Sequence, residues 1–173
     1  PRLPEIAGTA PDVRHIAAAL GLEPDDIGCD GHRPSVYSAG SLFYLVPVRN
    51  AAVLARAVPD RRGWAEVFPL GRHSLYVYTP TPEEADNDFA ARMFTPGAPR
   101  GEDAATGSAA AALIGALALD APEGQSEYRL RQGVEMGRPS LITMQLRKDG
   151  DTLVYGSIGG HAVIVGQGTL ELD

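Results

Sequence analysis

The sequence predicts an α+β domain in which a curved, mostly antiparallel sheet or barrel of about eight short strands wraps around one central apolar helix. Two observations predict this fold class. The segment 107–119 is apolar on every face, and a helix of that kind in a globular protein is buried on all sides. Runs rich in β-branched and aromatic residues recur before and after it, separated by turn-type residues. Such a pattern is typical of strands linked by hairpins.

The expected strands lie on both sides of the central helix. They are residues 41–48, 64–69, 74–79, 89–95, 127–131, 141–147, 153–157 and 161–165, with a further candidate at 169–172. Turn-type residues at 71–74, 148–151, 159–160 and 166–168 separate most of them.

The central helix would be about 20 Å long at roughly 1.5 Å per residue. That is short of the roughly 20 apolar residues that a membrane span needs. Most of its residues are Ala or Gly, so we expect the surrounding elements to approach its backbone closely.

Two amphipathic helices are expected at the periphery. Residues 11–22 carry apolar side chains at helical spacing, with Thr9 and Asp12 near the start and Gly21 near the end. Residues 50–58 begin at a good capping residue, Asn50, and stop before Pro59. Each is expected to cover part of the sheet, and residues 1–8 are expected to form an extended lead-in.

Composition narrows the class of protein. A chain of 173 residues fits one domain. The net charge of -7 comes without basic clusters, so neither nucleic acid nor an anionic membrane is an expected partner. The single cysteine, Cys29, excludes an intramolecular disulfide and suits a cytoplasmic location. The four histidines have no acidic or cysteine partner at metal-ligand spacing, so no metal is expected.

The junction at residues 99–108, PRGEDAATGS, is the most informative part of the chain. An acidic pair, Glu102 and Asp103, precedes the start of the apolar helix. The first N–H groups of a helix have no partner within the helix, and its dipole makes that end positive, so anions bind there. An acid beside a bound anion can exchange a proton with it. The alternative is structural: Asp103, Thr106 and Ser108 are also good helix caps, and Glu102 is equally compatible with a solvated or structural role.

Residues 92–96 (RMFTP) and 101–109 (GEDAATGSA) closely resemble the phenazine-biosynthesis PhzF-like isomerases. The matches at 38–40, 43–48, 132–133, 136–140, 159–160 and 162–163 follow in the order and rough spacing of that family. The resemblance extends from about residue 13 to the C-terminus. It implies a fold like that of diaminopimelate epimerase, in which two similar domains each wrap a sheet around a helix and the active site lies between them. This chain resembles the second, C-terminal domain.

The resemblance also implies a cofactor-independent isomerase or epimerase that transfers a proton within a small, possibly cyclic, amino acid or related carboxylate of secondary metabolism. Asp103 would be the catalytic residue. Thr106, Gly107, Ser108 and Ala109, with Glu102 nearby, would bind the substrate, whose carboxylate would lie on the N–H groups and hydroxyl of Gly107 and Ser108. No metal, flavin or pyridoxal cofactor is implied.

Departures from the family pattern set limits on this interpretation. Ala104 replaces a family Pro, which loosens the turn because Pro fixes φ and Ala does not. The first half of the family, with its proton-transfer glutamate and Gly-His motif, has no counterpart here. No cysteine stands in residues 103–108, so a two-cysteine racemase is not expected.

We therefore expect a missing N-terminal half or a partner chain, and a homodimer. Because the chain begins with Pro1 and not with Met, either an initiator Met was removed or an upstream portion is missing. The alternative function is a non-catalytic domain that binds a small carboxylate or mediates dimerisation. The substrate, and the activity of this chain alone, stay open.

Overall fold

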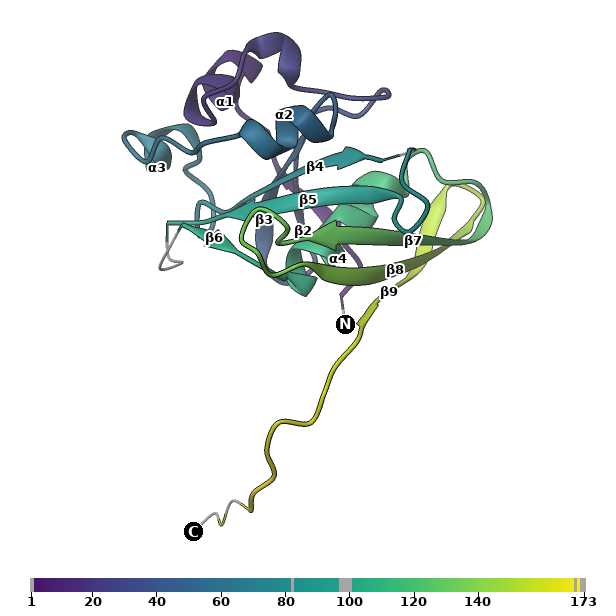
Figure 1. Cartoon of the computed structure of the whole chain (residues 1–173). Coiled ribbons are helices and arrows are strands. Elements are labelled where there is room, and N and C mark those ends of the chain that lie inside the picture. Colours follow the sequence, from purple (N-terminus) through teal and green to yellow (C-terminus); the bar gives the residue numbers. More distant parts are fainter. Residues whose placement is uncertain (1, 82, 97–100, 170, 172–173) are drawn as a thin grey trace.

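The computed structural model describes residues 2–81, 83–96, 101–169 and 171, and within them nine strands form one curved sheet around a helix (Figure 1). The strands are β1 Glu5–Gly8, β2 Ser35–Ser38, β3 Leu42–Pro47, β4 Leu75–Pro80, β5 Phe89–Phe94, β6 Glu102–Asp103, β7 Gly124–Gln132, β8 Ser140–Asp149 and β9 Thr152–Gly160. The helices are α1 Val13–Ala19, α2 Ala51–Arg56, α3 Trp64–Val67 and α4 Gly107–Leu117, with a short 3-10 helix, η1, at Pro24–Asp26.

The sheet has the order β1-β2-β3-β4-β5-β7-β8-β9, and β6 pairs with β5 beside this path. Only β3 with β4 and β5 with β7 pair in parallel among the described strands. Strands at both ends of the order, β1 and β9, contact α4, because the sheet curls around that helix (Figure 1). The predicted class, a curved and mostly antiparallel sheet around a central helix, is confirmed.

The central strands are buried on both faces. Along β4, Tyr76 and Tyr78 face the core around α4, whereas Leu75 and Val77 face a second core under the outer helices. Successive side chains of a strand point to opposite faces, so a strand between two cores is apolar along its whole length. This explains why these runs read as continuous apolar segments in the sequence.

Helix α4 is buried along most of its length, as its composition predicts. Gly115 lets the sheet approach, since a Cβ there would lie 2.5 Å from the ring of Tyr37. In the described part of the chain, no helix combines the length and the apolar character needed to cross a membrane.

The outer helices α1, α2 and α3 cover the other face of the sheet (Figure 1). Asp12 caps α1 by accepting the Arg14 N–H at 2.9 Å, and Asn50 caps α2 by accepting the Val53 N–H at 3.0 Å. Both predicted peripheral helices are confirmed, although α1 and α2 are shorter than expected.

The prediction of a strand at 64–69 is wrong, because this segment holds helix α3. Gly63 precedes the helix in a left-handed conformation, with a φ of 68°. Trp64 and Phe68 stand four residues apart, and their rings pack with centroids 4.8 Å apart. A spacing of four places two side chains on one helical face. The aromatic residues that favour a strand by composition therefore form the apolar face of a short helix.

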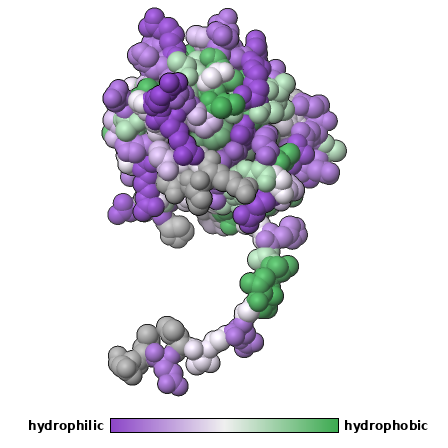
Figure 2. Space-filling view, turned by 60° about the vertical axis from the view of Figure 1, so that its left-hand side comes forward, coloured by the Kyte–Doolittle hydropathy of each residue, from purple (hydrophilic) through white to green (hydrophobic). Residues whose placement is uncertain are grey.

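The prediction of a strand at 161–165 is also wrong. Gly159 and Gly160 do not form a turn but end β9, opposite Thr143 and Ile142. The chain then leaves the sheet, and Val163, Ile164 and Val165 are 82%, 94% and 95% exposed (Figure 2). Of the candidate strand 169–172, Thr169 and Glu171 are not in a strand, and positions 170 and 172 lie outside the described residues.

Three short strands, β1, β2 and β6, were not expected from the sequence. β1 lies within the expected lead-in and pairs with β2. They have four, four and two residues, too few for an alternating pattern to stand out.

Candidate active site

The candidate site is built where β5 meets β6, beginning with Arg92. Its side chain is almost fully buried and makes a bidentate pair with Glu102, with Nε–Oε1 and Nη2–Oε2 distances of 2.8 and 2.9 Å. Its Nη1 donates to the carbonyls of Leu54, Ala55 and Ala57 at 3.1, 3.1 and 2.9 Å. Bidentate, charge-assisted pairs are strong and directional, so Arg92 fixes both the end of α2 and the residue that precedes Asp103.

Asp103 and Thr106 face one another across the turn that leads into α4. The Thr106 hydroxyl donates to Oδ2 of Asp103 at 2.6 Å. Thr106 is the N-cap residue of α4, but its side chain makes no capping hydrogen bond. Asp103 and Ser108 are exposed, and Gly107 is half-buried.

Gln132, at the end of β7, supports this turn from beneath. It is fully buried. Its Oε1 accepts the Thr106 N–H at 3.1 Å and the Tyr76 hydroxyl at 2.9 Å. Its Nε2 donates to the Asp103 carbonyl at 2.8 Å and to Thr106 Oγ1 at 3.1 Å. One amide therefore connects β4, β7 and the two residues that flank the turn.

Burial raises the pKa of the Tyr76 hydroxyl well above its usual range, and the nearby charge of Asp103 raises it further. Tyr76 therefore stays a neutral donor to Gln132 at all ordinary pH values.

Gly133 is held against the same turn. Its φ is +84°, and a Cβ there would lie 2.6 Å from the Ala104 carbonyl and 2.4 Å from the Arg138 carbonyl. Both contacts are to backbone, which has little freedom to move. Gly133 therefore lets the Asp103–Thr106 turn lie directly on the end of β7.

The first N–H groups of α4 are divided between partners and open space. Gln132 accepts the Thr106 N–H, and the N–H groups of Ala109 and Ala110 both donate to the Thr106 carbonyl at 3.1 Å. In the part of the chain that the structure describes, the N–H groups of Gly107 and Ser108 have no hydrogen-bond partner. Two free donors at the positive end of a helix form an anion-binding arrangement.

A cavity of about 970 Å³ opens in front of this helix end, and we call it the α4 cavity. Three of the predicted site residues line it: Asp103, Thr106 and Ser108. The remaining wall comes from Gly40, Ser41, Leu42, Phe43, Gly71, Arg72, His73, Ser74, Met93, Thr95 and Pro96.

The other predicted site residues do not line the cavity. Glu102 is paired with Arg92, and Ala109 is fully buried within α4. Gly107 is not among the lining residues but lies between two that are. The start of the predicted motif, residues 99 and 100, lies outside the described residues.

Sequence reasoning did not find a role for Gln132, Tyr76 or the 71–74 turn. A polar residue at an inward-facing strand position, followed by Gly133, was the signal available for Gln132.

Cys29 takes no part in this site. Burial raises the pKa of its thiol to about 12, with Asp30 adding to the shift. Among the residues with described positions, no His, Cys, Asp and Glu side chains gather into a group of three that could hold a metal ion.

Comparison with known proteins gives consistent matches along the chain. A family model described as phenazine biosynthesis-like protein matches residues 1–168. An uncharacterized isomerase of Mesorhizobium japonicum is 42% identical over 175 residues, which cover 98% of this chain and 58% of the relative. The trans-2,3-dihydro-3-hydroxyanthranilate isomerase of Pseudomonas chlororaphis is 32% identical over 141 residues, covering 79% of this chain and 47% of the relative.

Solved structures agree on the fold. A phenazine biosynthesis protein of the PhzF family from Bacillus anthracis superposes with a TM-score of 0.74 at 20% identity, covering 91% of this chain and 58% of its own. A predicted epimerase from Pseudomonas aeruginosa gives 0.64 at 27% identity, covering 96% and 57%. The chain thus spans about half the length of the relatives that it matches.

Proposed function

Since this chain belongs to the PhzF family of phenazine biosynthesis-like proteins, we propose that it is one half of a cofactor-independent isomerase. The enzyme moves a proton within a small amino acid or a related carboxylate. The observation that carries this proposal is the α4 cavity. It is lined by Asp103, which is exposed, and by Ser108, whose N–H group has no partner among the described residues; Gly107, with the second such N–H group, lies between two lining residues.

The substrate carboxylate lies on the N–H groups of Gly107 and Ser108, with the Ser108 hydroxyl as a further donor. Backbone donors of this kind are fixed before the ligand arrives, so they lose little freedom when it binds. Thr106 lines the cavity beside them, and Ala109 contributes the buried backbone that follows.

Asp103 contacts the substrate amine or exchanges the proton. A positioned acid or base must lie within hydrogen-bond reach of the atom that it serves. Two hydrogen bonds hold Asp103 in one orientation: the Thr106 hydroxyl donates to its carboxylate, and the Gln132 amide donates to its backbone carbonyl. Glu102 does not contact the substrate directly, because both oxygens of its carboxylate accept hydrogen bonds from Arg92. It supports the neighbouring Asp103.

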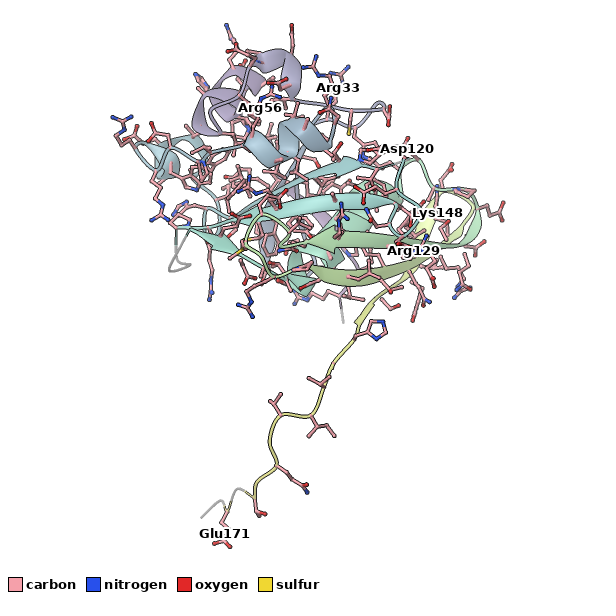
Figure 3. All side chains as sticks on the ribbon, viewed as in Figure 1. Arg33, Arg56, Asp120, Arg129, Lys148 and Glu171 are labelled. Carbon is pink, nitrogen blue, oxygen red and sulfur yellow. The ribbon has the colours of Figure 1, made fainter. Side chains whose placement is uncertain are left out.

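The other half of the active site comes from an N-terminal half or a partner chain. The half-length match supports this. An exposed apolar segment also supports it: the β-branched residues 163–165 stand clear of the body, as Figure 2 shows by colour. The side chains on this segment reach no other element in Figure 3, where Glu171 marks its far end. Exposed apolar segments of this kind mark interaction sites. The same segment could bind a second copy of this chain in a homodimer.

The name of one relative, trans-2,3-dihydro-3-hydroxyanthranilate isomerase, supports the proposed substrate class. An amino acid of that type carries the carboxylate that the helix start fits. We propose a cytoplasmic location because the single thiol, Cys29, suits a reducing compartment.

The test combines this chain with the N-terminal half of the Mesorhizobium japonicum relative and follows hydrogen–deuterium exchange at the carbons of trans-2,3-dihydro-3-hydroxyanthranilate by NMR. Exchange is expected, and Asp103→Asn should slow it about 100-fold or more, the usual contribution of a general acid or base. Asp149→Asn, at the exposed last residue of β8, is the matched control and should leave the rate unchanged.

An absence of exchange in a mixture that binds the amino acid would refute catalysis. If, in addition, calorimetry gave equal affinities for the wild-type and Asp103→Asn proteins, the chain would be a plain carboxylate-binding domain, the alternative function.

A further inference from the structure

Part of the wall of the α4 cavity is formed by the turn before β4, and this turn carries the titratable side chain of His73. His73 lines the cavity together with Asp103, Thr106 and Ser108, although these residues follow it by 30 to 35 positions in the sequence. The proposed proton transfer and carboxylate binding do not use it. Its neighbours on the turn, Arg72 and Ser74, line the cavity as well.

The backbone of His73 is fixed in an uncommon conformation. Its φ is +55°, the left-handed region that few residues other than glycine adopt. Its N–H donates to the Leu70 carbonyl at 3.2 Å, and its own carbonyl accepts the indole N–H of Trp64 at 2.7 Å. Such conformations persist where the surroundings impose them, and they are frequent at functional sites.

The imidazole ring is fixed too. Nδ1 lies 2.6 Å from the carbonyl oxygen of Phe68. A carbonyl only accepts hydrogen bonds, so Nδ1 carries the proton, and in the neutral ring Nε2 is left as an acceptor. Within the described residues Nε2 has no hydrogen-bond partner.

His32 provides a contrast inside the same molecule. Its Nδ1 lies 2.9 Å from the Tyr78 hydroxyl, and its Nε2 lies 3.5 Å from Asp120. Each ring nitrogen of His32 therefore has a polar group of the chain near it. In His73, by contrast, Nε2 has no hydrogen-bond partner among the described residues, and the residue lines the same cavity as Asp103, Thr106 and Ser108.

We propose that His73 is a specificity-determining residue of this site. Its Nε2 accepts a hydrogen bond from a hydroxyl group that the substrate carries in addition to its carboxylate. This inference rests on the proposed function, because it takes the carboxylate to lie on Gly107 and Ser108. The preferred ligands are small hydroxylated amino acids or hydroxy acids, and the same acids without the hydroxyl bind less tightly.

The variant that separates this role from a structural one is His73→Asn. The Asn amide N–H takes the place of Nδ1–H and can still donate to the Phe68 carbonyl, and Asn tolerates a positive φ. Nothing in Asn replaces Nε2. His15→Asn, on the exposed face of α1, is the matched control, and thermal unfolding of each variant checks that the fold is kept.

The experiment measures the affinity of this chain for two probes, 3-hydroxyanthranilate and anthranilate, by NMR titration. The expected result is that His73→Asn weakens 3-hydroxyanthranilate binding about tenfold, equivalent to about 1.4 kcal/mol, and changes anthranilate binding less than twofold. His15→Asn should change neither affinity.

Suppose that both probes bind the wild-type protein. If His73→Asn then weakens the binding of both equally, or leaves both affinities unchanged, the specificity role of His73 is refuted while the carboxylate site stands. If neither probe binds at millimolar concentration, both the inference and the proposed carboxylate site are refuted.

Discussion

Replacing Gln132 by Leu tests whether one buried amide holds the candidate site in shape. Leu is close to Gln in size, so the change removes the four hydrogen bonds of the amide while keeping most of the packing. Four groups lose this partner. The Thr106 hydroxyl keeps its bond to Asp103, whereas the Tyr76 hydroxyl, the Thr106 N–H and the Asp103 carbonyl are left unpaired. Each buried polar group left unpaired costs about 1–3 kcal/mol.

The gain from burying a more apolar side chain offsets about 2 kcal/mol of this loss. We therefore expect the free energy of unfolding to fall by about 1–7 kcal/mol. Urea unfolding, followed by circular dichroism and by the fluorescence of the single Trp64, measures the change.

The matched control is Gln145→Leu on β8. This amide also makes side-chain hydrogen bonds, to Glu127 at 2.7 Å and from Ser157 at 3.3 Å, but it lies near the surface, where water replaces them. Its substitution should cost less than about 1 kcal/mol. If the free energy of unfolding of the Gln132→Leu protein lay within about 1 kcal/mol of the wild-type value, the view that this network stabilises the Asp103–Thr106 turn would be refuted.

Three further predictions concern groups outside the cavity. Arg92→Lys should lower the free energy of unfolding by about 3–5 kcal/mol, because an ammonium group cannot reach both Glu102 and three carbonyls. Arg62→Lys, whose exposed partner is Asp60, should leave the urea midpoint unchanged, and equal effects of the two variants would contradict the account. Hydrogen bonds from Arg56 and from the backbone of Glu23 lower the pKa of Asp26. A lowered pKa stabilises the fold above the unfolded-state pKa and ceases to do so as the pH falls through the folded-state value. The advantage of the wild type over Asp26→Asn should therefore be full at pH 7 and shrink below about pH 4, and an advantage independent of pH in urea titrations would contradict this. Because the pKa of Cys29 is about 12, its thiol should react with Ellman's reagent at pH 8 about 1,000-fold more slowly than free cysteine. It should react fully in urea, and rapid labelling of the folded protein would contradict the burial.

The architecture could be predicted from the sequence because its main signal is local. An eleven-residue helix without a polar stripe must be enclosed, and the strands that enclose it are rich in β-branched and aromatic residues. The motif before α4 also indicated the helix start correctly. What the sequence did not indicate is set by contacts between distant residues.

The errors follow from the same cause. The aromatic run at Trp64 favours a strand locally, yet packing of Trp64 on Phe68 selects a helical turn. Residues 161–165 have a strand-like composition, but a strand needs a neighbour to pair with, and the described part of this chain supplies none. Gln132 and His73 are brought to the site by strand register and by a turn, and neither can be recognised from sequence spacing alone.

The central claim is that the start of α4 holds the carboxylate of a small acid beside Asp103. The most direct measurement is a titration of the ¹⁵N-labelled chain with anthranilate, followed by amide NMR. The amides of Gly107 and Ser108 should show the largest saturable shifts, since hydrogen bonding to a carboxylate changes an amide shift directly. Saturable shifts at other amides, with Gly107 and Ser108 unchanged, would contradict the claim.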